Sequence, residues 1–253
     1  MSYHNNSSTL IGTTVSDYTV EERIWQGATS TVYKCTSANG KAKYGNIAAL
    51  KVLHPYRREP IQIKRFAKEA QIQKKLNHKN IIQVYFYGKT GLSFFIFMEY
   101  VGGKNIRNFL QNSSVNDKQS LKMLKEVAEA LEFTHNKNII HNDIKPENIL
   151  YDPTTNSFKL TDFGYARPIQ RWFRKTEHSG GTAGYMAPER KQGVFNQRSD
   201  IYSFGVVMKE VLTDKIKDYK PELIFNKATQ KNPDKRYASF TELIKDINNY
   251  LYQ

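Results

Sequence analysis

The 253-residue chain has one cysteine, Cys35, few acidic residues for its number of basic ones, and no long apolar run. A single cysteine excludes an intramolecular disulfide framework and a cysteine-rich zinc site, and it favours a reducing compartment. The polar start MSYHNNSSTLIGTTV and the absence of an apolar segment long enough to cross a bilayer predict a soluble protein with no membrane span. We therefore expect a cytoplasmic or nuclear location.

The charge is strongly unbalanced. Lys and Arg number 38 against 24 Asp and Glu, which gives a formal net charge of +14. Such a field attracts acidic proteins, polyphosphates, nucleic acid or anionic membrane. Composition does not choose among these partners, and a solvated lysine-rich surface accounts for the charge equally well. Nucleic-acid binding therefore stays an alternative that rests on charge alone.

Two regions follow a short polar segment. Residues 1–16 are rich in Ser, Thr and Asn and offer little apolar surface to offset ordering entropy, so we expect a flexible leader. Residues 17 to about 100 hold short β-like runs and one helical stretch that begins near Pro60. Residues from about 101 to 253 follow helical periodicity. We predict an α+β, bilobal domain over 17–253, with a β-rich N-terminal lobe and a mainly helical C-terminal lobe.

Two charged residues are expected to be buried in the β-rich half. Glu69 shares a predicted helix face with apolar residues, and Lys51 alternates with Ala49 on one face of the strand IAALKVL. Buried charges persist when they are paired or bound to ligand, so Lys51 and Glu69 are natural partners. The alternative is a lysine that extends to the surface and a glutamate at the helix edge.

Two polar clusters lie in the second half. In IIHNDIKPENILYD, Asp143 and Asn148 are five residues apart, and Pro146 breaks regular structure between them. Both side chains are therefore expected on a loop, where an acid and an amide can converge on a metal ion and a hydroxyl. In LTDFG, Asp162 precedes a flexible Gly164. Either cluster alone is compatible with an ordinary Asx turn.

The order of these motifs resembles the protein-kinase family from about Tyr18 to the C-terminus. The family set is a Gly-rich loop, a V-A-I-K lysine, a helix glutamate, H-R-D-x-x-x-x-N, D-F-G and A-P-E. The corresponding segments are Trp25–Val32 (WQGATSTV), Ala48–Lys51 (AALK), Glu69, His141–Asp143 (HND) with Asn148, Asp162–Gly164 (DFG) and Ala187–Glu189 (APE). Two further matches, the D-x-W-S-x-G-like helix start at Asp200 and Arg236 as the partner of Glu189, imply structural roles.

The resemblance implies an ATP-dependent serine/threonine protein kinase that uses ATP and Mg²⁺. Lys51, oriented by Glu69, would hold the α- and β-phosphates, and Asp143 would accept the proton of the substrate hydroxyl. Lys145 and Thr182 resemble the serine/threonine branch, in which the lysine touches the γ-phosphate and the threonine bonds the catalytic aspartate. The implied metal ligands are Asn148 and Asp162. The implied nucleotide contacts are Gly27, Ser30, Val32, Ala49, Lys51, Met98, Glu99, Val101, Leu150 and Asp162; for the apolar ones a plain core role is equally compatible.

Three positions depart from the family pattern. The Gly-rich loop keeps only Gly27, with Trp25 and Ser30 in place of flanking glycines, which predicts weaker nucleotide binding. Gln73 stands where an apolar residue usually packs on the D-F-G phenylalanine, and it either loosens the helix or hydrogen-bonds nearby. Asn142 replaces an arginine that normally binds a phosphate on the activation segment, so we predict that activity does not require phosphorylation of that segment. Order would come instead from intrinsic packing or from an activating protein partner.

The substrate-binding part is short. Only 35 residues separate Asp200 from Arg236, which leaves room for at most one helix after the predicted helix IYSFGVVMKEVL. Such compactness resembles some viral or bacterial effector kinases, for which the location would be a host-cell cytosol. Five basic residues near the expected substrate segment predict acidic protein substrates. They are Arg167, Arg171, Arg174, Lys175 and Arg190.

The main alternative is a pseudokinase-like scaffold that acts through protein binding. The five residues of the transfer machinery are all present, and a scaffold would not need them together. They are Lys51, Glu69, Asp143, Asn148 and Asp162. A small-molecule kinase fits less well, because the segment from Gly181 to Glu189 resembles the peptide-binding segment of protein kinases.

Overall fold

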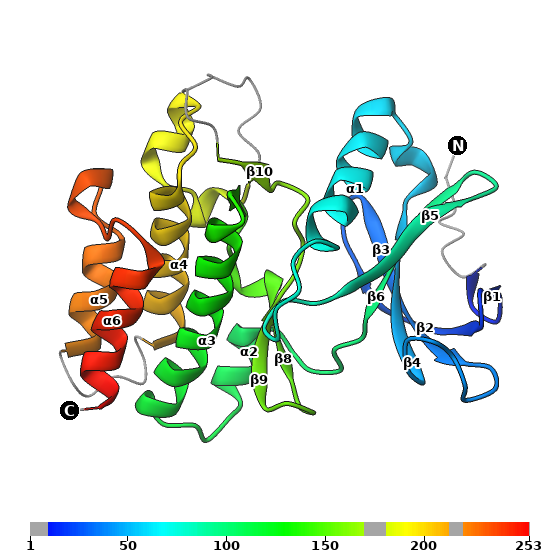
Figure 1. Cartoon of the computed structure of the whole chain (residues 1–253), viewed down its shortest axis with the longest axis horizontal. Coiled ribbons are helices and arrows are strands. Elements are labelled where there is room, and N and C mark those ends of the chain that lie inside the picture. Colours follow the sequence, from blue (N-terminus) through cyan, green and yellow to red (C-terminus); the bar gives the residue numbers. More distant parts are fainter. Residues whose placement is uncertain (1–9, 170–180, 213–219, 253) are drawn as a thin grey trace. The chain divides into compact units, whose positions relative to one another are not determined.

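The computed structural model describes residues 10–169, 181–212 and 220–252 (Figure 1). The chain divides into two compact units. The first consists of residues up to Asn77 together with Ile82–Val101, and the second of His78–Ile81 together with the chain from Gly102 onward. The four residues 78–81 thus belong to the second unit although they lie between two segments of the first. These join the second unit because Asn80 accepts a bond from Leu160 N and donates its side-chain amide to Phe158 O, both at 2.8 Å.

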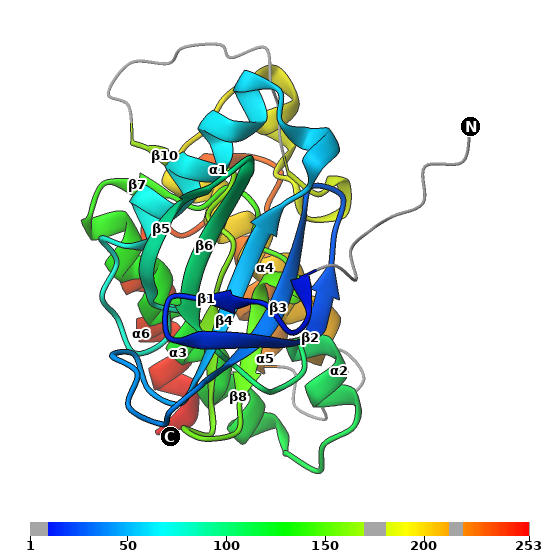
Figure 2. The ribbon, with the colours of Figure 1, turned by 90° about the vertical axis from the view of Figure 1, so that its right-hand side faces the viewer.

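The first unit is an antiparallel sheet with one long helix (Figure 2). Its strands, in the spatial order β1-β2-β3-β4-β6-β5, are β1 (Thr14–Val15), β2 (Tyr18–Gln26), β3 (Ser30–Ser37), β4 (Ile47–Leu53), β6 (Ser93–Glu99) and β5 (Val84–Thr90). Helix α1 (Pro60–Gln73) packs against β5 and starts at the proline that the sequence indicated. A 3₁₀ turn, η2 (Pro55–Arg57), lies between β4 and α1.

The expected leader over 1–16 is too long at its C-terminal end. Thr14 and Val15 form β1 and pair with Thr19 and Tyr18 of β2. Leu10 and Val15 pack against the core of the sheet. The apolar side chains within this polar segment thus make enough contacts to order residues 10–16. Residues 1–9 lie outside the described part of the chain.

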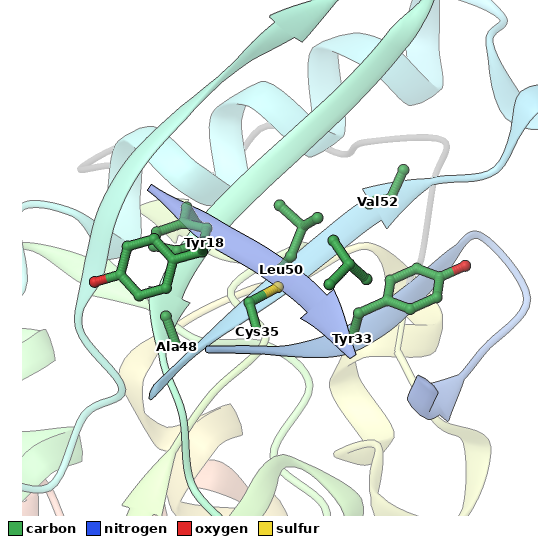
Figure 3. Packing of buried hydrophobic residues seen from close by; sticks show 8 residues of the cluster. Tyr18, Tyr33, Cys35, Ala48, Leu50 and Val52 are labelled. Atoms are coloured by element: carbon green, nitrogen blue, oxygen red, sulfur yellow. The ribbon is translucent and has the colours of Figure 1, made fainter. Parts of the chain in front are cut away.

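One face of this sheet forms a compact core (Figure 3). Cys35 is fully covered, and its neighbours Tyr18, Leu50 and Phe97 are exposed by 2% or less. The Tyr18 and Phe97 rings lie 4.7 Å apart, a favourable tilted contact. Burial raises the pKa of the Cys35 thiol to about 12, so this side chain acts as a small apolar group rather than a nucleophile.

The second unit is mainly helical, as the sequence predicted. Its helices are α2 (Ile106–Gln111), α3 (Asp117–Asn136), α4 (Gln197–Leu212), α5 (Lys220–Ala228) and α6 (Phe240–Leu251). Short strands form two ribbons, β7 (Ile139–Ile140) with β10 (Arg167–Pro168), and β8 (Ile149–Asp152) with β9 (Ser157–Leu160). The 3₁₀ turns are η3 (Pro146–Asn148), η4 (Ala183–Tyr185), η5 (Pro188–Gln192) and η6 (Pro233–Lys235).

Helix α3 shows why the sequence folds this way. Asn116 and Gln119 form a reciprocal capping box at its start, which satisfies two backbone donors that the helix itself leaves open. The apolar stripe of α3 is buried along its length. Helix α3 packs against α6, and the two helices lie beside each other in Figure 1. The stripe consists of Leu121, Leu124, Val127, Ala128 and Leu131, all exposed by 1% or less. Helix α3 is thus the central element of the second unit.

Helix α4 starts at Gln197, four residues before the predicted run IYSFGVVMKEVL. In the described part of the stretch between Thr213 and Lys231, α5 is the only helix, which agrees with the limit of one that the spacing set. Residues 213–219 lie outside the described part. Among the described helices, none combines the length and the apolar character that a membrane-crossing segment requires.

Close contact between α4 and α5 depends on one glycine. A Cβ at Gly205 would lie 2.6 Å from Ala228 Cβ and 3.0 Å from Thr229 Cγ2. We expect Gly205→Ala to lower the free energy of unfolding by about 1–3 kcal/mol through overpacking. The higher helix propensity of alanine, worth about 1 kcal/mol, offsets only part of the cost of a backbone shift between two packed helices. Urea unfolding monitored by circular dichroism measures it.

The matched control is Gly184→Ala, because a Cβ at Gly184 meets no atom within 4 Å. We expect its stability to stay within about 0.5 kcal/mol of the unmodified protein, as for most surface substitutions. Equal or higher stability of Gly205→Ala would contradict the close packing of α4 on α5.

Candidate functional site

In the first unit, a buried ion pair joins strand and helix. Lys51 Nζ of β4 lies 2.5 Å from Glu69 Oε1 of α1, and the two residues are 7% and 6% exposed. The predicted pairing therefore forms, and the alternative of a lysine extended to the surface is wrong. A buried charge without a partner would be strongly destabilising, so each of the two charges is stabilised by the other. Glu69 also holds the Lys51 ammonium in one orientation.

Gln73, one turn further along α1, hydrogen-bonds nearby. Its Nε2 donates to Ile82 O at 2.8 Å, and the residue is 1% exposed. Of the two alternatives for this position, the local hydrogen bond is therefore the one that forms. It ties the last turn of α1 to the start of the segment that leads into β5.

The loop between β2 and β3 is tightly folded on its remaining glycine. Gly27 N donates to Ser30 O at 2.9 Å, and a Cβ at Gly27 would lie only 2.0 Å from a ring atom of Trp25. A larger residue at this position would have to displace the exposed indole of Trp25. Ser30 is 1% exposed, and within the described residues its hydroxyl has no hydrogen-bond partner. Its burial does not support a direct phosphate contact through the side chain.

The remaining implied nucleotide contacts of this unit lie on adjoining strands. Val32 of β3 is opposite Lys51, and Ala49 of β4 is opposite Met98 of β6. Glu99 ends β6, where its backbone N–H donates to Gln83 O at 2.9 Å. Val101 closes the unit and is 8% exposed.

In the second unit, one carboxylate anchors the loop of residues 141–148. Asp200 of α4 is 1% exposed and accepts the backbone N–H groups of His141 at 2.8 Å and Asn142 at 2.9 Å. Its Oδ2 also lies 2.9 Å from His135 Nε2. Burial acts to raise the pKa of Asp200, but the contacts with His135 and Asn142 outweigh it and hold that pKa below its ordinary value.

Three expected site residues meet around Asp143, which is 4% exposed. Thr182 Oγ1 donates to Asp143 Oδ1 at 3.0 Å, and Lys145 Nζ lies 3.1 Å from Asp143 Oδ2 and 3.0 Å from Thr182 Oγ1. Asn148 Nδ2 donates to Asp143 O at 2.8 Å and to its Oδ2 at 3.2 Å. The carboxylate is therefore held at both oxygens.

Asp162 is tied to this network through the backbone. Thr161 N donates to Asn148 O at 2.9 Å, and Asp162 itself has a left-handed φ of 61°. Asp162 Oδ1 accepts Gly164 N at 3.3 Å, and Phe163 is buried against His141 with ring centroids 4.6 Å apart. Leu150, on β8, is half-buried in the same unit.

The donor set of Asn148 and Asp162 fits Mg²⁺. Because the amide nitrogen of Asn148 is used on Asp143, its oxygen is the atom left to act as a ligand, beside the carboxylate of Asp162. Hard oxygen donors of this kind suit a cation that keeps several waters and phosphate oxygens. The described residues contain no cluster of three or more His, Cys, Asp or Glu side chains that could hold a metal ion.

Sequence patterns missed one polar cluster in this unit. Arg107 of α2 donates to Tyr185 OH at 2.7 Å and to Glu147 Oε1 at 2.8 Å, and it also pairs with Glu210. Tyr185 OH in turn donates to Glu210 Oε2 at 2.5 Å. Burial and the bond to Glu210 raise the pKa of Tyr185 to about 12. Arg107 and Glu210 are 103 positions apart, so no local spacing could indicate the pair.

The proposed basic substrate cluster needs a correction. Arg190 is 2% exposed, because its side chain turns inward between Asn142 and the ring of Phe195. It therefore does not contribute to a surface that attracts acidic substrates. Arg171, Arg174 and Lys175 lie outside the described residues.

The structural pair expected at the end of the chain does form. Arg236 donates from Nη1 and Nη2 to the two carboxylate oxygens of Glu189, both at 2.8 Å. This fork-to-fork geometry is the strong form of an ion pair. It ties η5 to the segment that precedes α6.

The chain is similar in sequence to known proteins. A family model described as a protein kinase domain matches residues 18–248. A probable serine/threonine-protein kinase of Clostridium acetobutylicum is 34% identical over 82% of this chain and 32% of its own length. Serine/threonine-protein kinase PrkC of Bacillus subtilis is 32% identical over 79% and 36%, and PknB of Mycobacterium tuberculosis is 38% identical over 65% and 28%. The chain thus spans about a third of the length of the curated relatives it matches.

The lowered pKa of Asp200 predicts acid sensitivity. A carboxylate whose pKa is lowered on folding stabilises the protein above its ordinary pKa, which is 3.8 for Asp. This stabilisation is lost as the pH falls through the lower pKa of the folded state. Burial acts to raise the pKa of Glu189, but the hydrogen bonds from Arg236 outweigh it and lower that pKa from its ordinary value of 4.5. Protonation of Glu189 below pH 4.5 therefore also removes stability. We expect the free energy of unfolding to decline below about pH 4.5, measured by urea unfolding between pH 7 and pH 2.

Asp200→Asn isolates the contribution of Asp200. An amide accepts through one oxygen only, so we expect a loss of about 1–3 kcal/mol at pH 7 for each backbone donor left without an acceptor. The decline towards low pH should also be shallower than in the unmodified protein. A variant with unchanged stability and an unchanged pH profile would show that Asp200 does not anchor the loop.

Proposed function

This chain belongs to the protein kinase domain family, and we propose that it transfers the γ-phosphate of ATP to serine or threonine hydroxyls of other proteins. The observation that carries this proposal is the triangle of Asp143, Lys145 and Thr182, with all three separations between 3.0 and 3.1 Å. An enzyme that acts on a phosphate and a hydroxyl needs a fixed carboxylate and a cation beside it. Both are present on one short loop.

Asp143 is proposed as the group that accepts the substrate hydroxyl proton. Phosphoryl transfer depends mainly on positioning and charge neutralisation, so the orientation of the carboxylate matters more than its basicity. Thr182 and Asn148 each donate to one carboxylate oxygen and limit its rotation. Lys145 is proposed to touch the transferred phosphate, since its ammonium lies beside Asp143.

Lys51 is proposed to hold the α- and β-phosphates. Its ammonium is buried and is oriented by Glu69, so its position does not have to be organised when nucleotide binds. Asn148 and Asp162 would hold Mg²⁺, which when bound neutralises phosphate charge. The apolar residues proposed to cover the adenine are Val32, Ala49, Met98 and Leu150, with backbone groups of Glu99 and Val101 at its edge.

A pseudokinase-like scaffold remains the competing function, with protein binding in place of transfer. Catalysis is favoured by the buried charges of Lys51, Glu69 and Asp143. A buried charge has no advantage for stability over a well-packed apolar residue, so its presence points to a role in transfer. Acidic protein substrates and an activating partner are proposed only on the net charge of +14 and on the replacement at Asn142. The positive net charge is also compatible with nucleic acid as a binding partner.

The direct test is transfer of labelled phosphate from ATP with Mg²⁺ to an acidic protein, casein, and a basic one, histone. We expect Asp143→Asn to lower kcat by about 10²–10⁴-fold, as expected for loss of a general base. Lys51→Met should lower kcat/KM by about 10²–10³-fold, as for loss of a charge that stabilises the transition state. Asp162→Ala should abolish the dependence on Mg²⁺ together with the activity.

The matched control is Lys64→Met, which removes an exposed lysine from the same unit as Lys51. It should retain full activity. Transfer by Lys51→Met or Asp143→Asn at the unmodified rate would refute the site, and binding of ATP without any transfer by the unmodified chain would favour the scaffold.

Residue specificity gives a separate prediction. Thr182 and Lys145 form the serine/threonine pattern around Asp143, so phosphoserine and phosphothreonine should dominate the products. Thr182→Val removes a hydroxyl bonded to a carboxylate, which corresponds to a loss of about ten- to a hundredfold in kcat. Phosphoamino-acid analysis measures the first and steady-state kinetics the second. Products that are mainly phosphotyrosine would contradict the assignment.

A further inference from the structure

Arg190 is a large polar side chain buried in a place that the proposed mechanism does not use. It lies on η5, is 2% exposed, and its guanidinium carbon is 5.1 Å from the ring centroid of Phe195. Arg167 lies 4.4 Å from the same centroid. Fixing an arginine in the interior is unfavourable unless its donors are satisfied by specific acceptors. Its surroundings therefore indicate a role.

The first contact of Arg190 is with the loop that carries Asp143. Its Nη1 donates to the carbonyl oxygen of Asn142 at 2.5 Å. Asn142 has a left-handed φ of 66°, a conformation that asparagine adopts more readily than most other L-residues. Asp200 holds the N–H of Asn142, and Arg190 holds its C=O. The peptide bond that leads into Asp143 thus starts from a residue fixed on both sides.

The second contact is with the segment that carries Thr182. A Cβ at Gly181 would lie 3.0 and 3.1 Å from the two terminal nitrogens of Arg190, and 3.1 Å from Asn142 O. Gly181 has a φ of 130°, so both its conformation and the available space require glycine. The guanidinium therefore lies directly against the residue that precedes Thr182. It touches both backbone segments whose side chains meet at Asp143.

The charges around Arg190 favour its staying protonated there. Burial lowers the pKa of the guanidinium, and the carboxylates of Asp200 and Asp143 oppose that effect. Arg167 adds to the lowering, and Glu189 adds to the raising. A cation placed between the anchor Asp200 and the catalytic Asp143 also reduces the repulsion between these two carboxylates.

We propose that Arg190 is a positioning residue that clamps the Asn142 carbonyl and the Gly181 backbone together, so that Thr182 and Lys145 meet Asp143 without any modification of the chain. This inference rests on the proposed phosphotransfer function and adds to it the residue that holds the catalytic loop. Arg190 lies on η5, directly after Glu189, whose ion pair with Arg236 fixes this turn, so the position of the guanidinium is set by folding. An added phosphate is not needed to place it.

The test compares Arg190→Met, Arg190→Lys and the exposed neighbour Lys191→Met in the whole chain. We expect Arg190→Met to lower kcat by about tenfold or more, as for loss of a charged hydrogen bond, with the KM for ATP changed by less than about twofold. Arg190→Lys, which keeps the charge and can still donate to Asn142, should recover part of kcat. Lys191→Met should have no effect.

A double-variant cycle separates positioning from a merely structural role. If Arg190 acts through Thr182, the combination of Arg190→Met and Thr182→Val should lose little more kcat than the worse single variant. Strictly multiplicative losses would overturn the proposal, and so would full kcat in Arg190→Met. A fall in activity that only follows the folded fraction, measured by thermal unfolding, would also overturn it.

Should Arg190→Met not fold, Arg190→Lys carries the test: a folded variant with lowered kcat and unchanged KM for ATP supports the clamp, and full kcat overturns it. If the unmodified chain transfers no phosphate, the proposed function fails. If it is active and Arg190→Met is equally active, only the role of Arg190 fails.

Discussion

The second unit depends on the buried carboxylate of Asp200. A loop without regular structure has backbone donors that neither helix nor sheet satisfies, and burying them is unfavourable unless an acceptor is provided. Asp200 provides it for His141 and Asn142 from the rigid surface of α4. The loop can therefore leave the strand β7, turn through a left-handed residue and present Asp143 in one orientation.

The polar groups of the site then form a chain of supports rather than a set of independent contacts. Asp200 and Arg190 hold Asn142 from its two ends, Asn148 and Thr182 hold Asp143, and Thr161 links this loop to Asp162. Hydrogen bonds are strengthened in a low-dielectric interior, so these contacts limit the movement of the loop. The first unit uses the simplest version of the same device, one buried ion pair between Lys51 and Glu69.

The main helices and strands follow from local sequence patterns. Period-two runs formed the strands of the first unit, the stripe on α3 became its buried face, and Pro60 started α1. The expected leader is too long because Thr14 and Val15 are too few to show any period. Only their pairing with β2 makes them a strand. The sequence predicts an exposed Arg190 because arginines usually are exposed, and its burial depends on the contact with Asn142, 48 positions earlier in the chain.

Local spacing and motif order in the sequence are enough to predict the β-rich and the helical parts of the chain and the charged groups of the site. Neither depends on where distant segments lie. Three features depend on the tertiary structure: the pairing of Arg107 with Glu210, the bonds from the His141 and Asn142 backbone to Asp200, and the inward turn of Arg190. Each of these joins residues separated by tens of positions, and the free energy of a polar contact depends on the burial and geometry that only the folded chain creates.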